Sequence, residues 1–345
     1  MKILLYEEYC HRMHGNQKYI KLLSEYMPNE IMIVTSQKSI LYNNLTGNVK
    51  FLKSNVSIFK AVELYKIIKS YNADFVMVNN ERSLLTAFIP SMLLNKKVIW
   101  YVKNMYKNFI FDLVGLLISH KVFFIEKELI QNKFYFFNCC FNKKKKILKI
   151  GVDGDGFLEI NKNKNTLKTN VLMLSTISEN KGVRVAVKAM KIADKNNKFI
   201  HLKIVGSIPK GGNFFYKEML SEINLLKNCK IEILPWEKDI NSLFRWSDVY
   251  ILPSYKEGVP RSLVEAMLSG KPAIATRIGG IPSLIEHNKT GILIESGDYI
   301  ALYRNMEKLM TNGVVYNSIS SYAKKHAQKN HLFEAHIANL IKLLS

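Results

Sequence analysis

The sequence predicts an α/β protein made of two doubly wound parallel-sheet domains. Short runs of apolar and β-branched residues alternate with longer amphipathic stretches along the 345-residue chain, which is typical of repeated βαβ units. This alternation breaks at a glycine-rich, polar stretch in the middle of the chain and then restarts. With 48% hydrophobic residues, the chain can build about two cores of ~150–170 residues each.

The first domain is predicted to span residues 1–155. Its buried strands are expected near residues 2–6, 31–35, 75–78, 97–102 and 121–125, with helical periodicity between them. Three glycines in the six residues from Gly151 to Gly156, followed by a polar stretch from Asn161 to Asn170, indicate a hinge.

The second domain is predicted to span residues 165–325. Apolar residues recur at three- and four-residue spacing from Val183 to Ala193, which predicts a helix that lies on a sheet. Beyond residue 313 the pattern is helical, and we expect residues 330–345 to form a C-terminal helix that packs back on the first domain. The strands of the second domain are expected near residues 170–175, 202–205, 230–234, 248–252, 272–275 and 291–294.

The chain is strongly basic, with a formal net charge of +22. The first 150 residues carry 23 basic and 10 acidic side chains, so this half is the more basic one. Such a field favours anionic partners, among them nucleic acid, phosphorylated substrates and acidic membrane surfaces. A chain rich in Lys, Asn and Ile is also what AT-rich coding produces, and the sequence leaves this explanation of the surplus open.

The cysteines and the apolar runs exclude several classes of protein. Cys10, Cys139, Cys140 and Cys229 show no CxxC spacing, so neither a disulfide scaffold nor a Cys-rich zinc site is expected, and a reducing cytoplasm fits best. The longest apolar runs are shorter than the 18 or more residues of a membrane span. We therefore expect a cytoplasmic protein.

The most informative stretch runs from Tyr250 to Met267 and passes from an apolar strand through a loop into a helix. Pro260 stands where the helix is expected to begin. The first backbone N–H groups of that helix lack intrahelical partners and lie at the positive end of its dipole, so they suit a diphosphate. Glu257 and Glu265 can accept hydrogen bonds from sugar hydroxyls. The alternative is that both acids are solvated and pair with Lys271 or Arg261. The backbone N–H groups that would bind the diphosphate belong to Arg261, Ser262 and Leu263.

This stretch resembles the E-x7-E motif of family 4 glycosyltransferases of the GT-B fold. Lys181-Gly182, Gly206 and Gly279-Gly280 follow predicted strands in the order that the family shows. In the first domain the resemblance is weaker and rests on the early strand followed by Gly15. The resemblance implies two Rossmann-like domains that face each other across a cleft.

The resemblance also implies an activity, namely retaining transfer of a sugar from a nucleotide-diphosphate sugar, with a UDP-sugar favoured. It implies no metal and no other cofactor. The acceptor would be a glycan or a polyprenyl-diphosphate-linked saccharide of capsule or lipopolysaccharide biosynthesis, held by the first domain. Glu257 would hold the donor sugar and Lys181 the leaving diphosphate, as catalytic residues, while Glu265 would hold the ribose. Donor-binding residues would be Glu265, Gly15, Thr176, Gly206, Trp236, Gly258, Arg261, Ser262 and Leu263.

The sequence departs from the family at two places. Ser175-Thr176 replaces the usual Gly-Arg, so one phosphate ligand is missing, and we expect Arg184, Arg261 or Arg277 to supply the second positive charge. Lys103-Asn104 stands where many relatives place an active-site histidine. Two histidines beside Gly15 could serve the acceptor side or lie at the surface; these are His11 and His14.

Three further features have alternative interpretations. Trp236 either stacks on the nucleobase or packs against the protein. Asp153-Gly154-Asp155 has the spacing of a metal-diphosphate motif, but in a glycine-rich linker a solvated turn is the better interpretation. The aromatic stretch from Phe134, followed by the lysine run 143–146, predicts either docking on an anionic membrane surface, peripheral to the inner face of the cell membrane, or a buried helix with a solvated lysine turn.

Two other functions compete with the transferase. A catalytically silent GT-B partner subunit is compatible with Thr176 and Lys103 at positions where ligands are expected. A nucleic-acid-binding protein would use the +22 charge, but none of the usual recognition motifs is present, so no nucleic-acid partner is expected.

Overall fold

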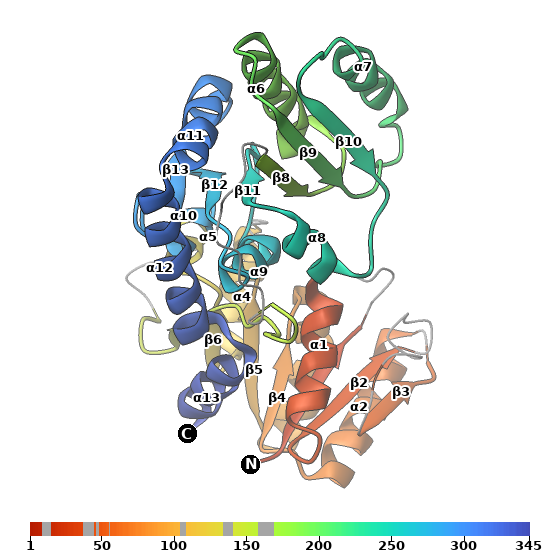
Figure 1. The fold of residues 1–345 in the computed structure, drawn as a ribbon. Helices are drawn as coiled ribbons and strands as arrows, with labels where there is room; N and C mark the ends of the chain where they lie inside the picture. The colour runs from red at the N-terminus through yellow and green to blue at the C-terminus, as the bar shows by residue number, and fades with distance from the viewer. Residues whose placement is uncertain are drawn as a thin grey trace. The chain divides into compact units, whose positions relative to one another are not determined.

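The computed structural model describes residues 1–8, 15–36, 45, 48–54, 56–103, 108–133, 141–157 and 169–345. The chain divides into two compact units. The first unit contains Met1–Gly151 together with the C-terminal segment Phe333–Ser345, and the second contains Val152–Leu332. Each unit is a parallel sheet covered by helices (Figure 1). In the described part of the chain, no helix is both long and apolar enough to cross a bilayer.

The first unit contains a seven-stranded sheet in the order β3-β2-β1-β4-β5-β6-β7, counted over the described residues. Every pair of neighbouring strands is parallel. The chain moves outward from β1 to β2 and β3 and then returns to β4 on the other side of β1, so the direction of winding switches between β1 and β4. The strands are β1 (Ile3–Glu7), β2 (Ile31–Ser36), β3 (Val49–Leu52), β4 (Phe75–Val78), β5 (Lys97–Val102), β6 (Lys121–Phe124) and β7 (Lys145–Ile147).

Helices cover both faces of this sheet. The core on one face contains residues of α1 and α13, and the core on the other contains residues of α2, α3 and α4. Right-handed crossovers explain this division, because α1 connects strands wound in one direction and α2 to α5 connect strands wound in the other. The helices are α1 (Gly15–Tyr26), α2 (Ser57–Tyr71), α3 (Glu81–Leu93), α4 (Phe109–Ile118), α5 (Lys127–Lys133) and α13 (Phe333–Leu344).

Two strands of this sheet were not predicted. Both β3 and β7 are edge strands with lysines among their few residues, and they show no clear apolar alternation. The lysine run 143–146, expected as a solvated turn or a membrane contact, enters β7, where the side chain of Lys145 is buried.

The second unit contains a six-stranded parallel sheet in the order β10-β9-β8-β11-β12-β13. The direction of winding switches here between β8 and β11, since β9 and β10 follow on one side of β8 and β11 pairs with its other side. The strands are β8 (Thr169–Leu174), β9 (Ile200–Val205), β10 (Lys230–Leu234), β11 (Val249–Leu252), β12 (Ala273–Thr276) and β13 (Ile292–Ile294).

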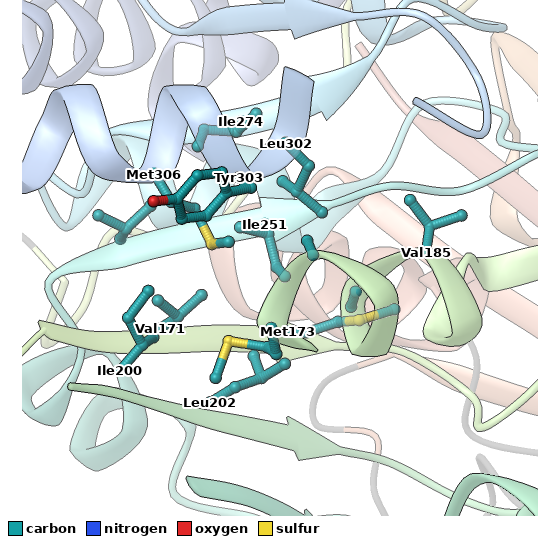
Figure 2. Close-up of a cluster of buried hydrophobic side chains, with 14 of the residues drawn as sticks. Val171, Met173, Val185, Ile200, Leu202, Ile251, Ile274, Leu302, Tyr303 and Met306 are labelled. Atoms are coloured by element: carbon teal, nitrogen blue, oxygen red, sulfur yellow. The ribbon is translucent and has the colours of Figure 1, made fainter. Parts of the chain in front are cut away.

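One core of the second unit lies between the sheet and the helices α6 and α11. Val171, Ile251 and Ile274 of the sheet meet Val185 of α6 and Leu302 of α11 in one buried cluster (Figure 2). The three- and four-residue spacing from Val183 to Ala193 therefore marks a helix face on the sheet, as predicted. The helices are η3 (Glu179–Lys181), α6 (Val183–Lys195), α7 (Asn213–Ile223), α8 (Ile240–Trp246), α9 (Arg261–Leu268), α10 (Ile281–Leu284), α11 (Tyr299–Thr311) and α12 (Gly313–His331).

The last helix belongs to the first unit. His336 of α13 is buried and forms hydrogen bonds through Nδ1 with the Lys149 carbonyl oxygen at 2.7 Å and through Nε2 with the Tyr19 hydroxyl at 3.1 Å. A Cβ on Gly151 would lie only 2.7 Å from the His336 Cβ, so glycine permits this close contact. The chain passes from the first unit to the second after Gly151 and returns after Leu332. The sequence placed the change of domain between residues 155 and 165.

Candidate functional site

The carboxyl ends of the strands in the second sheet carry the side chains selected from the sequence. Along this edge, Trp236 follows β10, Gly206 follows β9, Thr176 follows β8 and Glu257 follows β11. Because the strands are parallel, these loops emerge at the same edge of the sheet. In doubly wound sheets, ligands bind outside the carboxyl ends at the point where the winding switches. That point lies here between β8 and β11.

An ion pair bridges this switch point. Lys181, at the end of η3 after β8, places its Nζ 2.8 Å from Oε1 of Glu257, in the loop after β11. The hydroxyl of Ser254 donates a hydrogen bond to the same oxygen at 2.8 Å. The Glu257 side chain is only 10% exposed. Within the described residues, its other oxygen, Oε2, forms no hydrogen bond, so the carboxylate is held in place and keeps an acceptor for a ligand.

Two glycines allow the loops of this corner to approach one another. Gly182 has φ +72°, and a Cβ there would lie 1.9 Å from the Pro253 carbonyl oxygen. Gly279 has φ +49°, and a Cβ there would lie 2.1 Å from the Glu257 carbonyl oxygen. L side chains rarely adopt either conformation, and neither position has room for one. The glycines therefore fix the backbone on both sides of the Lys181–Glu257 pair.

The N-terminus of α9 presents donors beside this pair. Pro260 is the N-cap residue and provides no side-chain cap, and the first N–H groups of a helix have no intrahelical partners. The buried Tyr250 hydroxyl donates to Ser262 Oγ at 2.7 Å. Burial raises the pKa of Tyr250 well above its usual value, so the phenol remains a donor. Ser262 can then direct its own hydroxyl proton to a phosphate oxygen.

The second carboxylate is also inside the protein. Glu265 is the fifth residue of α9 and is 6% exposed. The alternative in which both acids face solvent is therefore wrong. Gly258 lies in open space, because a Cβ added there would meet no atom within 4 Å. This leaves the backbone next to Glu257 accessible to a bound molecule.

Three arginines could supply the second positive charge at the diphosphate, and their surroundings differ. Arg184 donates to Glu179 at 3.0 Å and forms a two-pronged pair with Glu218 at 2.7 and 3.0 Å, and hydrogen bonding to Glu218 is the main cause that raises its pKa. Its charge is thus already compensated. Arg277 is about half exposed and lies 3.4 Å from Glu295, whereas Arg261 begins α9 at the candidate phosphate position. Which arginine supplies the second positive charge therefore stays a prediction, with Arg261 the one placed at the start of α9.

Thr176 and Trp236, at the same edge of the second sheet, are exposed, whereas Gly206 is buried. Thr176 lies in the loop after β8, and its hydroxyl is 3.5 Å from that of Ser178. A Cβ on Gly206 would lie 1.9 Å from the Ser175 carbonyl oxygen, so the loops after β8 and β9 touch through the glycine. Trp236 is 56% exposed. Its indole is available for stacking rather than buried in a core.

The first unit has its own polar switch point, between β1 and β4. Asn80 donates from Nδ2 to Glu7 Oε1 and thereby joins the two strand ends. Lys60 Nζ lies 2.7 Å from Glu8 Oε1, and both side chains are buried. Asn79 is 7% exposed, and among the described residues both of its amide atoms, Nδ2 and Oδ1, are buried without a hydrogen-bond partner. Asn79 was not predicted from the sequence, although it begins an Asn-Asn pair directly after a buried strand.

Several predicted positions lie at or beyond the limits of the described residues. Gly15 is the first residue of α1, whereas His11, His14, Asn104 and the segment 134–140 are outside the described residues. Lys103 is described, and its Nζ lies 3.5 Å from the centre of the Tyr19 ring, a cation–π contact.

The Asp-Gly-Asp segment forms a turn. The Asp155 N–H donates to the Asp153 carboxylate at 3.1 Å, which is a typical Asx interaction. In the described part of the chain, no group of three or more His, Cys, Asp or Glu side chains could hold a metal ion.

Residues 157–326 match the family of glycosyl transferases group 1. The second unit is a group 1 glycosyl transferase domain. The matched residues include Lys181, Glu257 and the whole of α9, so the candidate site lies inside the family's domain.

Individual relatives match over very different lengths. The chain is 25% identical over 293 residues to an uncharacterized glycosyltransferase of Haemophilus influenzae, which covers 82% of this chain and 78% of the relative. It is 35% identical over 100 residues to a UDP-Gal:alpha-D-GlcNAc-diphosphoundecaprenol alpha-1,3-galactosyltransferase of Escherichia coli, covering 29% of this chain and 25% of that enzyme. The chain spans only 14% of the length of some other curated relatives that it matches.

A solved structure matches the whole chain. Anabaena Alr3699/HepE in complex with UDP superposes with a TM-score of 0.83 at 17% identity, covering 100% of this chain and 99% of that one. At this identity the match shows the fold. The group 1 domain and the sheet of the first unit together form the predicted GT-B fold of two Rossmann-like domains.

Proposed function

We propose that the protein is a retaining glycosyltransferase that needs no metal ion and uses a UDP-sugar as donor. The observation that carries this proposal is the Lys181–Glu257 pair, which bridges the switch point of a group 1 domain. A UDP complex of a structure with the same fold and the UDP-Gal named for one relative support uracil as the base.

The charges that develop in the reaction explain the roles of the residues. When the anomeric bond breaks, negative charge grows on the diphosphate and the sugar becomes oxocarbenium-like. Lys181, Arg261 and the N-terminus of α9 would stabilise the diphosphate, which is electrostatic stabilisation by groups already in place. Oε2 of Glu257 would accept hydrogen bonds from the donor sugar, and Glu265 would accept them from the ribose.

Donor binding is the first test. Because a ligand that binds only the folded state raises its stability, UDP and UDP-sugars should raise the melting temperature more than GDP- or ADP-sugars do. The shift and the release of UDP should be unchanged in excess EDTA, since no residue is assigned to a metal. Loss of the shift on chelation would contradict the metal-independent mechanism. Equal shifts for all three bases would contradict the choice of UDP.

We propose that the first unit holds the acceptor, a glycan or a polyprenyl-diphosphate-linked saccharide used for surface polysaccharide. The diphosphoundecaprenol acceptor named for one relative supports this class. In the structure itself, Asn79 supports it, because a buried amide without partners is costly and a saccharide hydroxyl can both donate to it and accept from it.

This role of Asn79 predicts a gain of stability from its removal. Asn79→Leu keeps the shape and removes the unsatisfied amide, so the free energy of unfolding should rise by about 1–3 kcal/mol while the acceptor KM increases. Thermal denaturation and acceptor-dependent UDP release measure the two effects. Asn80→Leu is the matched control and should be destabilising, since Asn80 caps α3 through the Ser83 N–H and holds Glu7. If Asn79→Leu destabilised the protein, the amide would have a partner and the role would be wrong.

A catalytically silent partner subunit is the second candidate. The observation in its favour is Thr176, since no cation stands where the family's arginine is expected. Such a subunit would bind UDP but release none from any UDP-sugar. Release of UDP by the wild type that is lost in Glu257→Gln would exclude the silent partner subunit.

A further inference from the structure

Tyr250 lies where the second sheet opens at its switch point. The ladder between β8 and β11 ends with the pair of Tyr250 and Leu172, although β8 continues to Leu174. The Tyr250 side chain is fully buried, and its ring packs against that of Phe244 in α8, with 5.9 Å between the ring centres. A buried phenol hydroxyl normally has hydrogen-bond partners, and here they come from two different elements.

The phenol hydroxyl of Tyr250 joins β8 to α9. The backbone of Leu174, the last residue of β8, forms a hydrogen bond with it in which the N–H donates. Because the phenol oxygen already accepts from Leu174, its own proton is left for Ser262 Oγ, at 2.7 Å. Burial raises the pKa of the phenol, so it keeps this proton at neutral pH. The hydrogen bond therefore runs from Tyr250 to Ser262.

Ser262 keeps a hydroxyl proton that no described residue accepts. A serine in a helix usually donates to the carbonyl oxygen four residues earlier, as Ser269 at the end of α9 does to Glu265 at 2.8 Å. For Ser262 that carbonyl belongs to Gly258, which lies before the helix and accepts the Gly280 N–H at 2.8 Å. Since Ser262 is only partly buried, its proton is available to a bound molecule.

An anionic oxygen is the acceptor that suits this proton. Ser262 is the second residue of α9, so its hydroxyl lies in the first turn, at the positive end of the helix dipole. A hydroxyl whose oxygen already accepts a hydrogen bond is polarised and becomes a better donor. Hydrogen bonds to a charged oxygen are stronger than those to a neutral one. A phosphate of the nucleotide meets all three conditions.

We propose that Tyr250 is a positioning residue of the donor site, which holds the Ser262 hydroxyl so that it donates to a phosphate oxygen of the nucleotide. Tyr250 is buried and acts only through Ser262. The inference rests on the proposed function, because it concerns the diphosphate of the same donor. It adds an oriented neutral ligand to a site in which Thr176 replaces the family's arginine. A purely structural bond that ties α9 to the sheet is the alternative.

A double-mutant cycle on UDP binding separates the two. Ser262→Ala should raise the dissociation constant of UDP about tenfold or more, because a hydrogen bond to a charged oxygen is lost. Tyr250→Phe should raise it roughly three- to tenfold, since the serine hydroxyl remains but is no longer oriented. The double variant should bind UDP no more weakly than Ser262→Ala does, because Tyr250 acts through that hydroxyl. Calorimetry measures these constants.

Uridine shows whether the loss arises at the phosphates. Because uridine has no phosphate, it should bind to the wild type and to all three variants equally, as measured by ligand-observed NMR titration. A distortion of the whole site would weaken uridine and UDP alike.

Two further variants control for the loss of a buried hydrogen bond in general. Tyr316→Phe removes a buried phenol that donates to the Asp248 carbonyl oxygen at 2.9 Å. Ser269→Ala removes the bond to Glu265 at the other end of α9. Both should lower the melting temperature of the free protein, as the test variants do, but leave the dissociation constant of UDP unchanged.

Three results would overturn the inference while the wild type binds UDP. Tyr250→Phe would bind UDP as tightly as the wild type, the effects of the two substitutions would add in the double variant, or uridine binding would fall together with UDP binding. An equal loss of UDP affinity in the control variants would also overturn it. Failure of the proposed function gives a different result, since the wild type itself would then bind no UDP, and the inference would fail with it.

Discussion

Glu257→Gln should reduce the release of UDP from a UDP-sugar by about 10²–10³-fold. The substitution keeps the shape of the side chain but removes the charge that pairs with Lys181 at 2.8 Å and faces the developing oxocarbenium ion. It also leaves Lys181 free to turn away from its position beside the diphosphate. Since Lys181 keeps 28% of its side chain exposed and a glutamine can still accept the hydrogen bond from Ser254, the melting temperature should change little. Initial rates with a panel of UDP-sugars measure the effect.

Glu286→Gln is the matched control for this substitution. It removes another Lys–Glu pair of the second unit, with Lys289 at 2.7 Å, but at an exposed position in the loop before β13. UDP release should be unchanged in this variant. If both variants lost UDP release equally, the loss would come from removing a negative charge anywhere in the second unit and not from the position of Glu257. If Glu257→Gln remained fully active, the assigned role of the carboxylate would be wrong.

Gly279→Ala should damage both the fold and the activity. The Cβ would meet the Glu257 carbonyl oxygen at 2.1 Å, and alanine is strained at φ +49°. Because the Gly280 N–H also donates to the Gly258 carbonyl oxygen at 2.8 Å, the loop that carries Glu257 must shift. We expect a loss of about 2–3 kcal/mol and a melting temperature lower by roughly 5–10 °C, together with loss of UDP release.

Gly313→Ala is the matched control for Gly279→Ala, because it adds the same methyl group at a position without positive φ or a close contact. Gly313 is the first residue of α12, has a negative φ, and would place a Cβ in open space. Alanine there should be neutral or slightly stabilising. If Gly279→Ala were as stable and active as Gly313→Ala, the close approach of the loops after β11 and β12 would not position Glu257.

The doubly wound fold was predictable because the central strands are continuous apolar runs. The sequence also placed Glu257 before a helix that begins after Pro260, which the structure confirms at α9. It did not predict that Lys181 pairs with Glu257, because that distance depends on β11 lying beside β8, and strand order is not encoded in local periodicity. The edge strands β3 and β7 were missed for the related reason that half-exposed strands lack a clear apolar pattern.

The exposure of apolar residues on α3 and α4 was not predictable either. Apolar spacing in α3 and α4 is compatible with either burial or exposure, and only the packing of α2, α3 and α4 on one face of the sheet distinguishes them. The sequence assigned membrane docking to the aromatic stretch and the lysine run, of which the structure describes only residues 141–146.

A crystal structure of the protein soaked with a UDP-sugar tests the central claim most directly. We expect the diphosphate against the first turn of α9 and within hydrogen-bonding distance of Lys181, with the sugar on the carboxylate of Glu257. A nucleotide bound elsewhere, with Lys181 and Glu257 still paired and untouched by it, would contradict the assignment of this corner as the donor site.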